Sequence, residues 1–140
     1  MIKVLSSILV IVYFAIAIIH IYWTFGGEKW IEKVLPTNEK GNRVLNPGKI
    51  ETFIVVFGLL LFTFYYFSKT GLFDIELPKL VVDYSGWIIS SIFILRAIGE
   101  FKYVGFFKKI KNTEFGKFDT KYFSILSLII GIIGILIEII

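Results

Sequence analysis

Residues 122–140 read YFSILSLIIGIIGILIEII, an apolar run long enough to cross a lipid bilayer as a helix. The small and polar residues in and just before this run recur every three or four positions, which places them on one helix face. Glycine and serine on such a face let helices pack closely inside a membrane. We therefore expect this helix to be buried along one stripe: Thr120, Ser124, Ser127, Gly131, Gly134 and Glu138.

Three further apolar segments precede this run, and together they set the fold class. The chain has 140 residues, of which 56% are hydrophobic and 18% aromatic, and its mean hydropathy is +0.81. These values are far from those of soluble domains. The sequence predicts an all-α membrane protein, a single domain over residues 1–140 that forms a four-transmembrane-helix bundle with helices at about 4–25, 50–67, 80–98 and 122–140.

The two long polar loops of this bundle hold most of the lysines and arginines. Positively charged loops are retained in the cytoplasm, so we expect both loops there and both termini outside, in a plasma membrane. The formal net charge of +4 then reflects topology, and we expect no nucleic-acid partner. Within the loops, residues 28–35 and 101–111 mix apolar and charged positions in a pattern typical of short interfacial helices.

The amino-acid composition excludes several classes of site. The chain has no cysteine and one histidine, His20. Disulfides, cysteine-bound zinc and iron–sulfur clusters all need cysteine, and bis-histidine haem or a three-histidine zinc site needs more than one histidine. We expect no metal site and no cofactor.

The residues best suited to chemistry lie near the predicted cytoplasmic ends of the first and third helices. His20 is the candidate general acid or base, with Glu51 or Glu100 as its partner carboxylate. Arg96 lies about one turn inside its helix end and suits a carboxylate or phosphate. The alternative for both is structural: a neutral His20 that fixes helix packing, and an Arg96 that pairs with Glu51 or Glu100 or reaches the headgroups. The central hypothesis is that His20 and Arg96 open onto one shared cavity.

Aromatic side chains accompany these charges. Tyr22 and Trp23 follow His20, and Tyr103 follows Arg96. They form either the walls of a pocket for a lipid-like ligand or the ordinary aromatic belt of a membrane protein.

A second polar group is predicted on the opposite side of the membrane. We expect Asp83, Tyr65 and Glu138 to lie close together there, with Lys3 as the counter-ion of Glu138. At the other end of the fourth helix, Asp119 or Thr120 is expected to cap the first turn.

Two motifs carry a resemblance to a known family. They are His20-x-Tyr22-Trp23-x-x-Gly26-Gly27 and Arg96-x-x-Gly99-Glu100-Phe101-Lys102-Tyr103-Val104-Gly105-Phe106-Phe107-Lys108, the second followed by Thr113-x-Phe115 and Asp119-Thr120-x-Tyr122. The chain resembles a bacterial family of small four-span membrane proteins catalogued as domain of unknown function 3995. That family usually has Gly-Asp-Phe-Arg where this chain has Gly99-Glu100-Phe101-Lys102. The resemblance implies a bacterial inner-membrane location and no particular activity.

Three functional hypotheses follow from the sequence. The first is binding of an amphipathic or lipid-like small molecule at the cytoplasmic interface, with or without acid–base chemistry at His20 that would make the protein an enzyme. The second is a non-catalytic accessory, immunity or assembly subunit that binds another membrane protein. The third is a small homodimeric transporter, which is disfavoured because every acidic residue lies near a helix end. Membrane lipid is an expected partner in each case.

Overall fold

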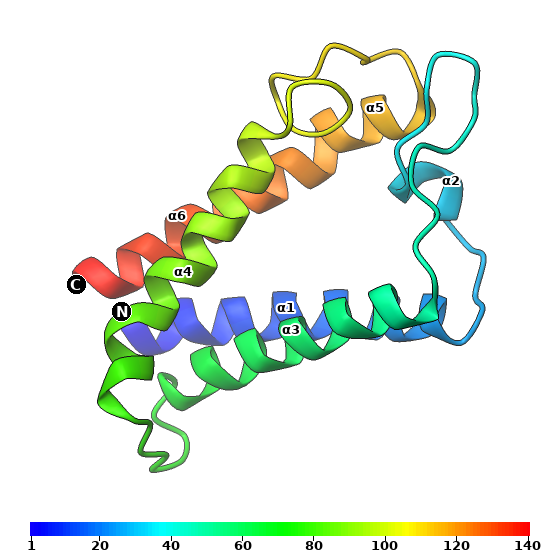
Figure 1. Cartoon of the computed structure of the whole chain (residues 1–140). Helices are drawn as coiled ribbons and strands as arrows, with labels where there is room; N and C mark the ends of the chain where they lie inside the picture. The colour runs from blue at the N-terminus through cyan, green and yellow to red at the C-terminus, as the bar shows by residue number, and fades with distance from the viewer. The chain divides into compact units, whose positions relative to one another are not determined.

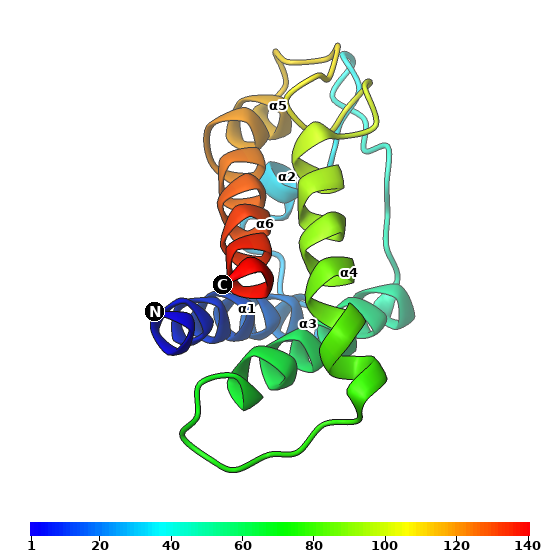
Figure 2. The same ribbon diagram turned by 90° about the vertical axis from the view of Figure 1, so that its left-hand side faces the viewer.

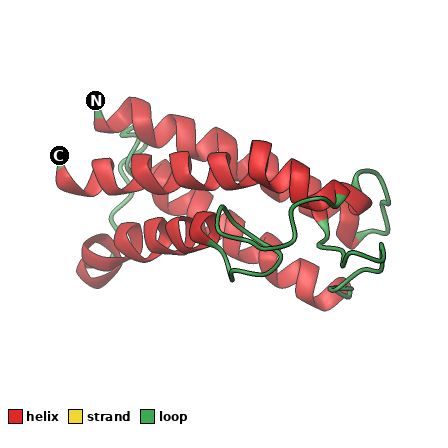
Figure 3. Cartoon of the chain, turned by 90° about the horizontal axis from the view of Figure 1, so that it is seen from above, coloured by secondary structure: helices red, strands yellow, loops and turns green.

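The computed structural model describes all residues from Met1 to Ile140 and contains only helices and loops, apart from one isolated bridge between Thr37 and Arg43 (Figure 3). The elements in chain order are α1 (Ile2–Thr24), α2 (Ile31–Val34), α3 (Lys49–Ser68), α4 (Lys79–Ile98), α5 (Glu114–Phe118), a π-helical turn η1 (Asp119–Phe123) and α6 (Ser124–Ile139) (Figure 1).

Four helical segments are long and apolar enough to cross a membrane: Ile2–Thr24, Lys49–Ser68, Lys79–Ile98 and Glu114–Ile139. The predicted four-span, all-α fold is therefore confirmed. Most of their large apolar side chains are exposed, for example Ile11, Phe53 and Leu95, as expected for surfaces that face lipid. The chain is a multi-pass membrane protein.

The structure divides into two compact units. The first unit comprises Met1–Gly27, Pro47–Ser90 and Ile132–Ile140, and the second comprises Glu28–Asn46 and Ser91–Gly131. Helices α4 and α6 each contribute one part to each unit.

In the first unit, α1 and α3 lie side by side and antiparallel (Figure 1). Their contact is formed by aromatic rings: Tyr13 of α1 stacks on Tyr66 of α3 with ring centroids 5.7 Å apart, and Phe62 meets Tyr13 at 5.8 Å. Helix α6 joins them through Gly134, because a Cβ there would lie 2.8 Å from the Tyr66 hydroxyl and would collide with Ser90 of α4. Helices α3, α4 and α6 therefore meet at Gly134.

In the second unit, the C-terminal part of α4 runs antiparallel to the start of α6 (Figure 2). Gly131 brings the two backbones together, since a Cβ on it would lie 2.6 Å from the Ile94 side chain. Ser124 and Ser127 are buried along the same face. The predicted small-residue stripe of the fourth helix is confirmed as its packing face from Ser124 to Glu138, but Thr120, its predicted first member, is exposed.

Two local predictions were wrong. The fourth helix begins at Glu114, where the Thr113 hydroxyl accepts a hydrogen bond from Gly116 N at 3.0 Å, so neither Asp119 nor Thr120 is the cap. Residues 101–111 form turns and bends, and the short helix of the second long loop is α5. The apolar–charged pattern of that segment does not form a helix because Gly99, Phe101 and Gly105 all have positive φ.

Candidate functional site

Asp119 is the centre of the densest polar contact in the second unit. It is fully buried in the π-helical turn η1. Its Oδ1 accepts a 2.6 Å hydrogen bond from Arg96 Nη2, and its Oδ2 accepts from Lys108 Nζ at 2.9 Å, Gly105 N at 2.8 Å and Ser124 Oγ at 3.0 Å. A carboxylate with this many donors is firmly held in its charged form. We call Arg96, Gly105, Lys108, Asp119 and Ser124 the Asp119 cluster.

Lys108 is the buried cation of this cluster. Its side chain has no exposed surface, and its Nζ also donates to Gly105 O at 2.9 Å and to Thr120 Oγ1 at 2.6 Å. All three protons of the ammonium group thus have acceptors, which is the condition under which a buried charge is tolerated.

Arg96 is the second cation and is only partly buried. Its side chain is 32% exposed, and its Nη2 makes the salt bridge to Asp119. Its Nη1 is buried and has no hydrogen-bond partner. Arg96 pairs with Asp119 across from the last turn of α4 and not with Glu100, so that predicted pairing was wrong. Glu51 belongs to the other unit, and its pairing with Arg96 stays a prediction.

The cluster therefore holds two cations against one carboxylate. Neutral donors supply its other contacts, so it carries one excess positive charge. That charge resides on the exposed part of Arg96, because Lys108 is enclosed. Such a site can bind an anion at the exposed part of the Arg96 side chain.

A tight loop after α4 brings Gly105 and Lys108 to Asp119. Gly99 and Gly105 have φ values of +88° and +89°, and a Cβ on either would collide with the backbone of the other strand of the loop. Only glycine fits both positions. Phe106 N donates to Ala97 O at 2.8 Å and closes the loop.

Glu100 stabilises the same loop through hydrogen bonds to its backbone. Its Oε1 accepts the backbone N–H groups of Tyr103 and Val104. Its carboxylate is thus used to hold the turn. Tyr103 itself lies with its ring centroid 5.2 Å from Lys102 Nζ.

His20 belongs to the first unit. Its Nδ1 donates to the Ile16 carbonyl oxygen at 2.9 Å, because a carbonyl can only accept, and this leaves the lone pair on Nε2. Its ring meets that of Trp23 edge-on at 4.9 Å. Tyr22 is 45% exposed.

His20 and Arg96 are in different units, and the cavity that they were predicted to share stays a prediction. Glu51 is exposed at the start of α3, where its carboxylate folds back toward Gly48, and no hydrogen bond joins it to His20. The proposed acid–base pairs thus also stay predictions. No group of three or more His, Asp and Glu side chains is placed to hold a metal ion.

A second buried carboxylate lies in the first unit. Glu138 Oε1 accepts from Lys69 Nζ at 2.7 Å and from the Tyr65 hydroxyl at 3.1 Å. The predicted approach of Tyr65 to Glu138 is confirmed, but the predicted counter-ion Lys3 was wrong. Lys69 takes that place because it follows Tyr65 by one helical turn and its Nζ reaches over the Tyr65 ring at 5.0 Å.

The expected third member of this group is absent from it. Asp83 is half-exposed and pairs with Lys79 at 3.8 Å. Gly86 lies against the Glu138 carboxylate instead. We call Tyr65, Lys69, Gly86 and Glu138 the Glu138 cluster.

The family assignment rests on most of the chain. Residues 13–134 match the family described as protein of unknown function (DUF3995). The chain belongs to the DUF3995 family. This confirms the resemblance inferred from the two motifs. Neither a curated protein nor a solved structure matches it.

The part that matches DUF3995 contains the whole Asp119 cluster together with His20. It ends before Glu138, so the Glu138 cluster lies only partly within it. Sequence reasoning missed Lys108 and Asp119 as site residues. A signal for Asp119 was present, since an aspartate within the reach of a membrane span needs a cation. Lys108 was missed because residues 101–111 were predicted to form an interfacial helix, whereas they form a tight loop.

Proposed function

We propose that this DUF3995 protein binds an anionic, amphipathic molecule of the lipid class, with the anionic group on Arg96. The observation that carries the proposal is the excess positive charge of the Asp119 cluster together with the buried, unpartnered Nη1 of Arg96. A buried guanidinium donor without a partner is costly, and a phosphate or carboxylate oxygen bound at the exposed part of Arg96 becomes its acceptor once the side chains around Nη1 move apart.

The position of Arg96 supports an amphipathic ligand over a soluble anion. Arg96 is in the last turn of α4, at the end of a helix able to cross the membrane. Lipid phosphates concentrate at that depth, while the acyl chains lie alongside the span. In this proposal the long, lysine-rich loops are cytoplasmic, so the ligand is taken from the inner leaflet of a bacterial plasma membrane.

Tyr103 has a secondary role in this proposal. It belongs to the same unit as Arg96 and would contact the apolar part of the ligand. The acid–base hypothesis for His20 concerns the first unit alone, where Nε2 of His20 keeps a lone pair that can accept a proton. Glu51 is the candidate carboxylate there, because Glu100 belongs to the second unit and is already bonded to two backbone amides.

The test is lipid binding to purified protein in detergent. Native mass spectrometry with added dimyristoyl phosphatidylglycerol, and separately with myristate, measures the affinity for a phosphate and for a carboxylate. We expect Arg96→Gln to weaken binding of at least one probe about tenfold, the loss of one charge-assisted contact. Arg43→Gln is the matched control, because Arg43 is an exposed arginine outside the cluster.

Arg96→Lys separates binding from folding. This variant keeps the charge beside Asp119, so it should remain folded and retain part of the affinity. The proposal is wrong if Arg96→Gln is folded and binds both probes as tightly as the wild-type protein.

One observation favours the second hypothesis, an accessory or assembly subunit. Gly58 of α3 has open space around the position of a Cβ, and Phe57 and Leu61 beside it are exposed. A glycine with open space at its Cβ position suits close packing of another membrane helix. Co-purification in mild detergent tests this, since Gly58→Leu should release a stoichiometric partner or a second copy of the chain.

A further inference from the structure

In the loop after α4, a lysine is buried and two phenylalanines are exposed, which is the reverse of the usual arrangement. Lys108 is fully buried in it, whereas Phe101 and Phe107 are 58% and 64% exposed. The two rings lie beside each other with centroids 6.5 Å apart. Both residues lie between the spans Lys79–Ile98 and Glu114–Ile139, so a membrane-crossing helix does not explain their exposure.

Backbone hydrogen bonds fix the position of Phe101. Phe101 has a φ of +69°, a conformation that is unfavourable for a bulky residue. It is fixed by Lys109 N, which donates to Phe101 O at 3.1 Å, and by Ile110 N, which donates to Lys102 O at 3.0 Å. These hydrogen bonds make the loop compact, and the two phenylalanines lie on its outer surface.

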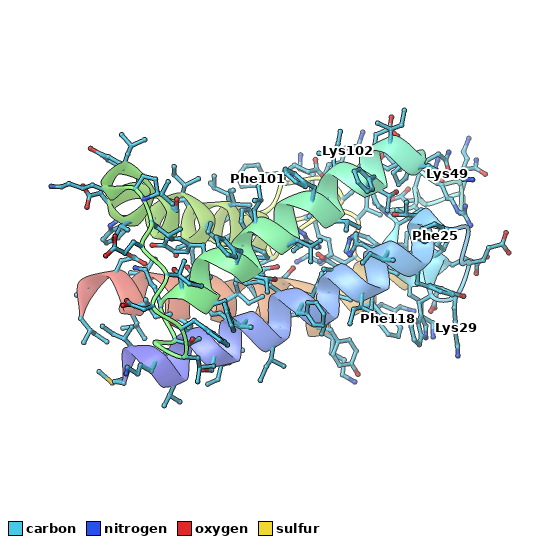
Figure 4. All side chains as sticks on the ribbon, turned by 90° about the horizontal axis from the view of Figure 1, so that it is seen from below. Phe25, Lys29, Lys49, Phe101, Lys102 and Phe118 are labelled. Carbon is cyan, nitrogen blue, oxygen red and sulfur yellow. The ribbon has the colours of Figure 1, made fainter.

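The charges around the two rings are positive. Lys102 directly follows Phe101, and Lys109 lies two residues after Phe107; both lysines are exposed (Figure 4, where Phe101 and Lys102 are labelled). The nearest acidic residue in the loop, Glu100, is engaged by the amides of Tyr103 and Val104. Exposed aromatic rings flanked by exposed lysines complement a bilayer surface that contains anionic lipids.

We propose that Phe101, Lys102, Phe107 and Lys109 form a lipid-docking knob that inserts into the headgroup region of an anionic leaflet. The partner is the anionic phospholipid surface itself. The proposal stands on the exposed face of the loop and is independent of anion binding at Arg96. The buried Lys108–Asp119 contact serves as the rigid base of the knob.

The experiment uses the absence of cysteine, which makes a single introduced label specific. Full-length protein carrying Lys102→Cys is labelled with the fluorophore NBD and reconstituted in vesicles of phosphatidylcholine, with or without phosphatidylglycerol. Lipids with a spin label near the headgroup quench the fluorophore only if it lies at the membrane. The matched control is the label at Asn112→Cys, an exposed position outside the knob.

We expect quenching at position 102 at least twice that at position 112, and stronger when phosphatidylglycerol is present. Phe101→Ser/Phe107→Ser should lower quenching at 102 to the control level. Phe101→Leu/Phe107→Leu should retain it, which separates loss of anchoring from loss of folding, and Lys109→Gln should reduce the effect of phosphatidylglycerol. Equal quenching at the two positions would overturn the proposal. So would a label at 102 that is shielded from both the lipid quencher and aqueous iodide, because that result indicates contact with a protein.

Discussion

The Asp119 and Glu138 clusters both keep a carboxylate away from solvent, but they pair it with different numbers of cations. Each holds one carboxylate that is almost or completely removed from solvent. Glu138 has a single cation, Lys69, and a tyrosine hydroxyl, so its charges balance. Asp119 has two cations and therefore an excess of positive charge. The balanced cluster is sufficient as a link between helices, whereas the unbalanced one is suited to an additional anion.

The clusters also differ in what holds them. Asp119 receives a backbone amide from a loop whose glycines cannot be replaced without collision, and its lysine is enclosed. Glu138 is bound only by side chains, and its lysine is partly exposed. Substitutions should therefore cost more in the Asp119 cluster than in the Glu138 cluster.

The largest effect should come from Asp119→Asn. This change leaves the enclosed Lys108 without its counter-charge, and breaking a buried pair in this way costs about 3 kcal/mol or more. Unfolding of the purified protein in detergent, followed by circular dichroism, measures the loss. Glu138→Gln is the comparison and should cost roughly 1–2 kcal/mol, because Lys69 can turn toward solvent.

Lys108→Met in the Asp119→Asn background is the control for this reasoning. It removes the stranded charge and keeps much of the side-chain volume, so it should restore part of the lost stability. If the double variant is no more stable than Asp119→Asn, the buried charge is not the cause. Equal losses for Asp119→Asn and Glu138→Gln would contradict the difference between the clusters.

An intermediate effect is expected at the glycines. Gly105→Ala places a Cβ against the Ile98 carbonyl at a φ of +89°, and the left-handed conformation alone costs about 1–2 kcal/mol. The atoms nearest to a Cβ at Gly86 belong to the Glu138 side chain, which can move more easily than backbone, and alanine gains helix propensity, so the cost of Gly86→Ala should be smaller. The same unfolding measurement compares them. A larger loss for Gly86→Ala would show that the Glu138 contact is the more rigid of the two.

The two clusters were not equally readable from the sequence. Tyr65 and Glu138 lie on helices whose 3.6-residue period is clear, so their approach was predictable. The counter-ion was not, because Lys3 and Lys69 are both at helix ends on the same predicted side, and only the packed structure selects Lys69. Periodicity places a residue on a face, but it does not choose between two cations that can reach that face.

The Asp119 cluster depends on tertiary contacts that no period encodes. Asp119 was interpreted as a cap, and Lys108 as one of several interfacial lysines. Their contact requires the chain to turn back at Gly99 and Gly105, which a charge pattern over residues 101–111 does not reveal. The glycines were visible as motif residues, and two glycines flanking an acidic residue at a helix end are a reasonable signal for a closed loop.

The smallest effect, and the finest test of the balanced cluster, should come from Tyr65→Phe. This change removes the 3.1 Å hydrogen bond to Glu138 but leaves the Lys69 ion pair and the ring beneath its ammonium group. A hydrogen bond to a carboxylate that keeps another strong partner contributes about 1 kcal/mol or less. Tyr84→Phe is the matched control, since the exposed Tyr84 should tolerate the change without loss. A loss as large as that of Glu138→Gln would mean that the hydroxyl, not Lys69, holds Glu138 in place, and that the cluster is not balanced by charge.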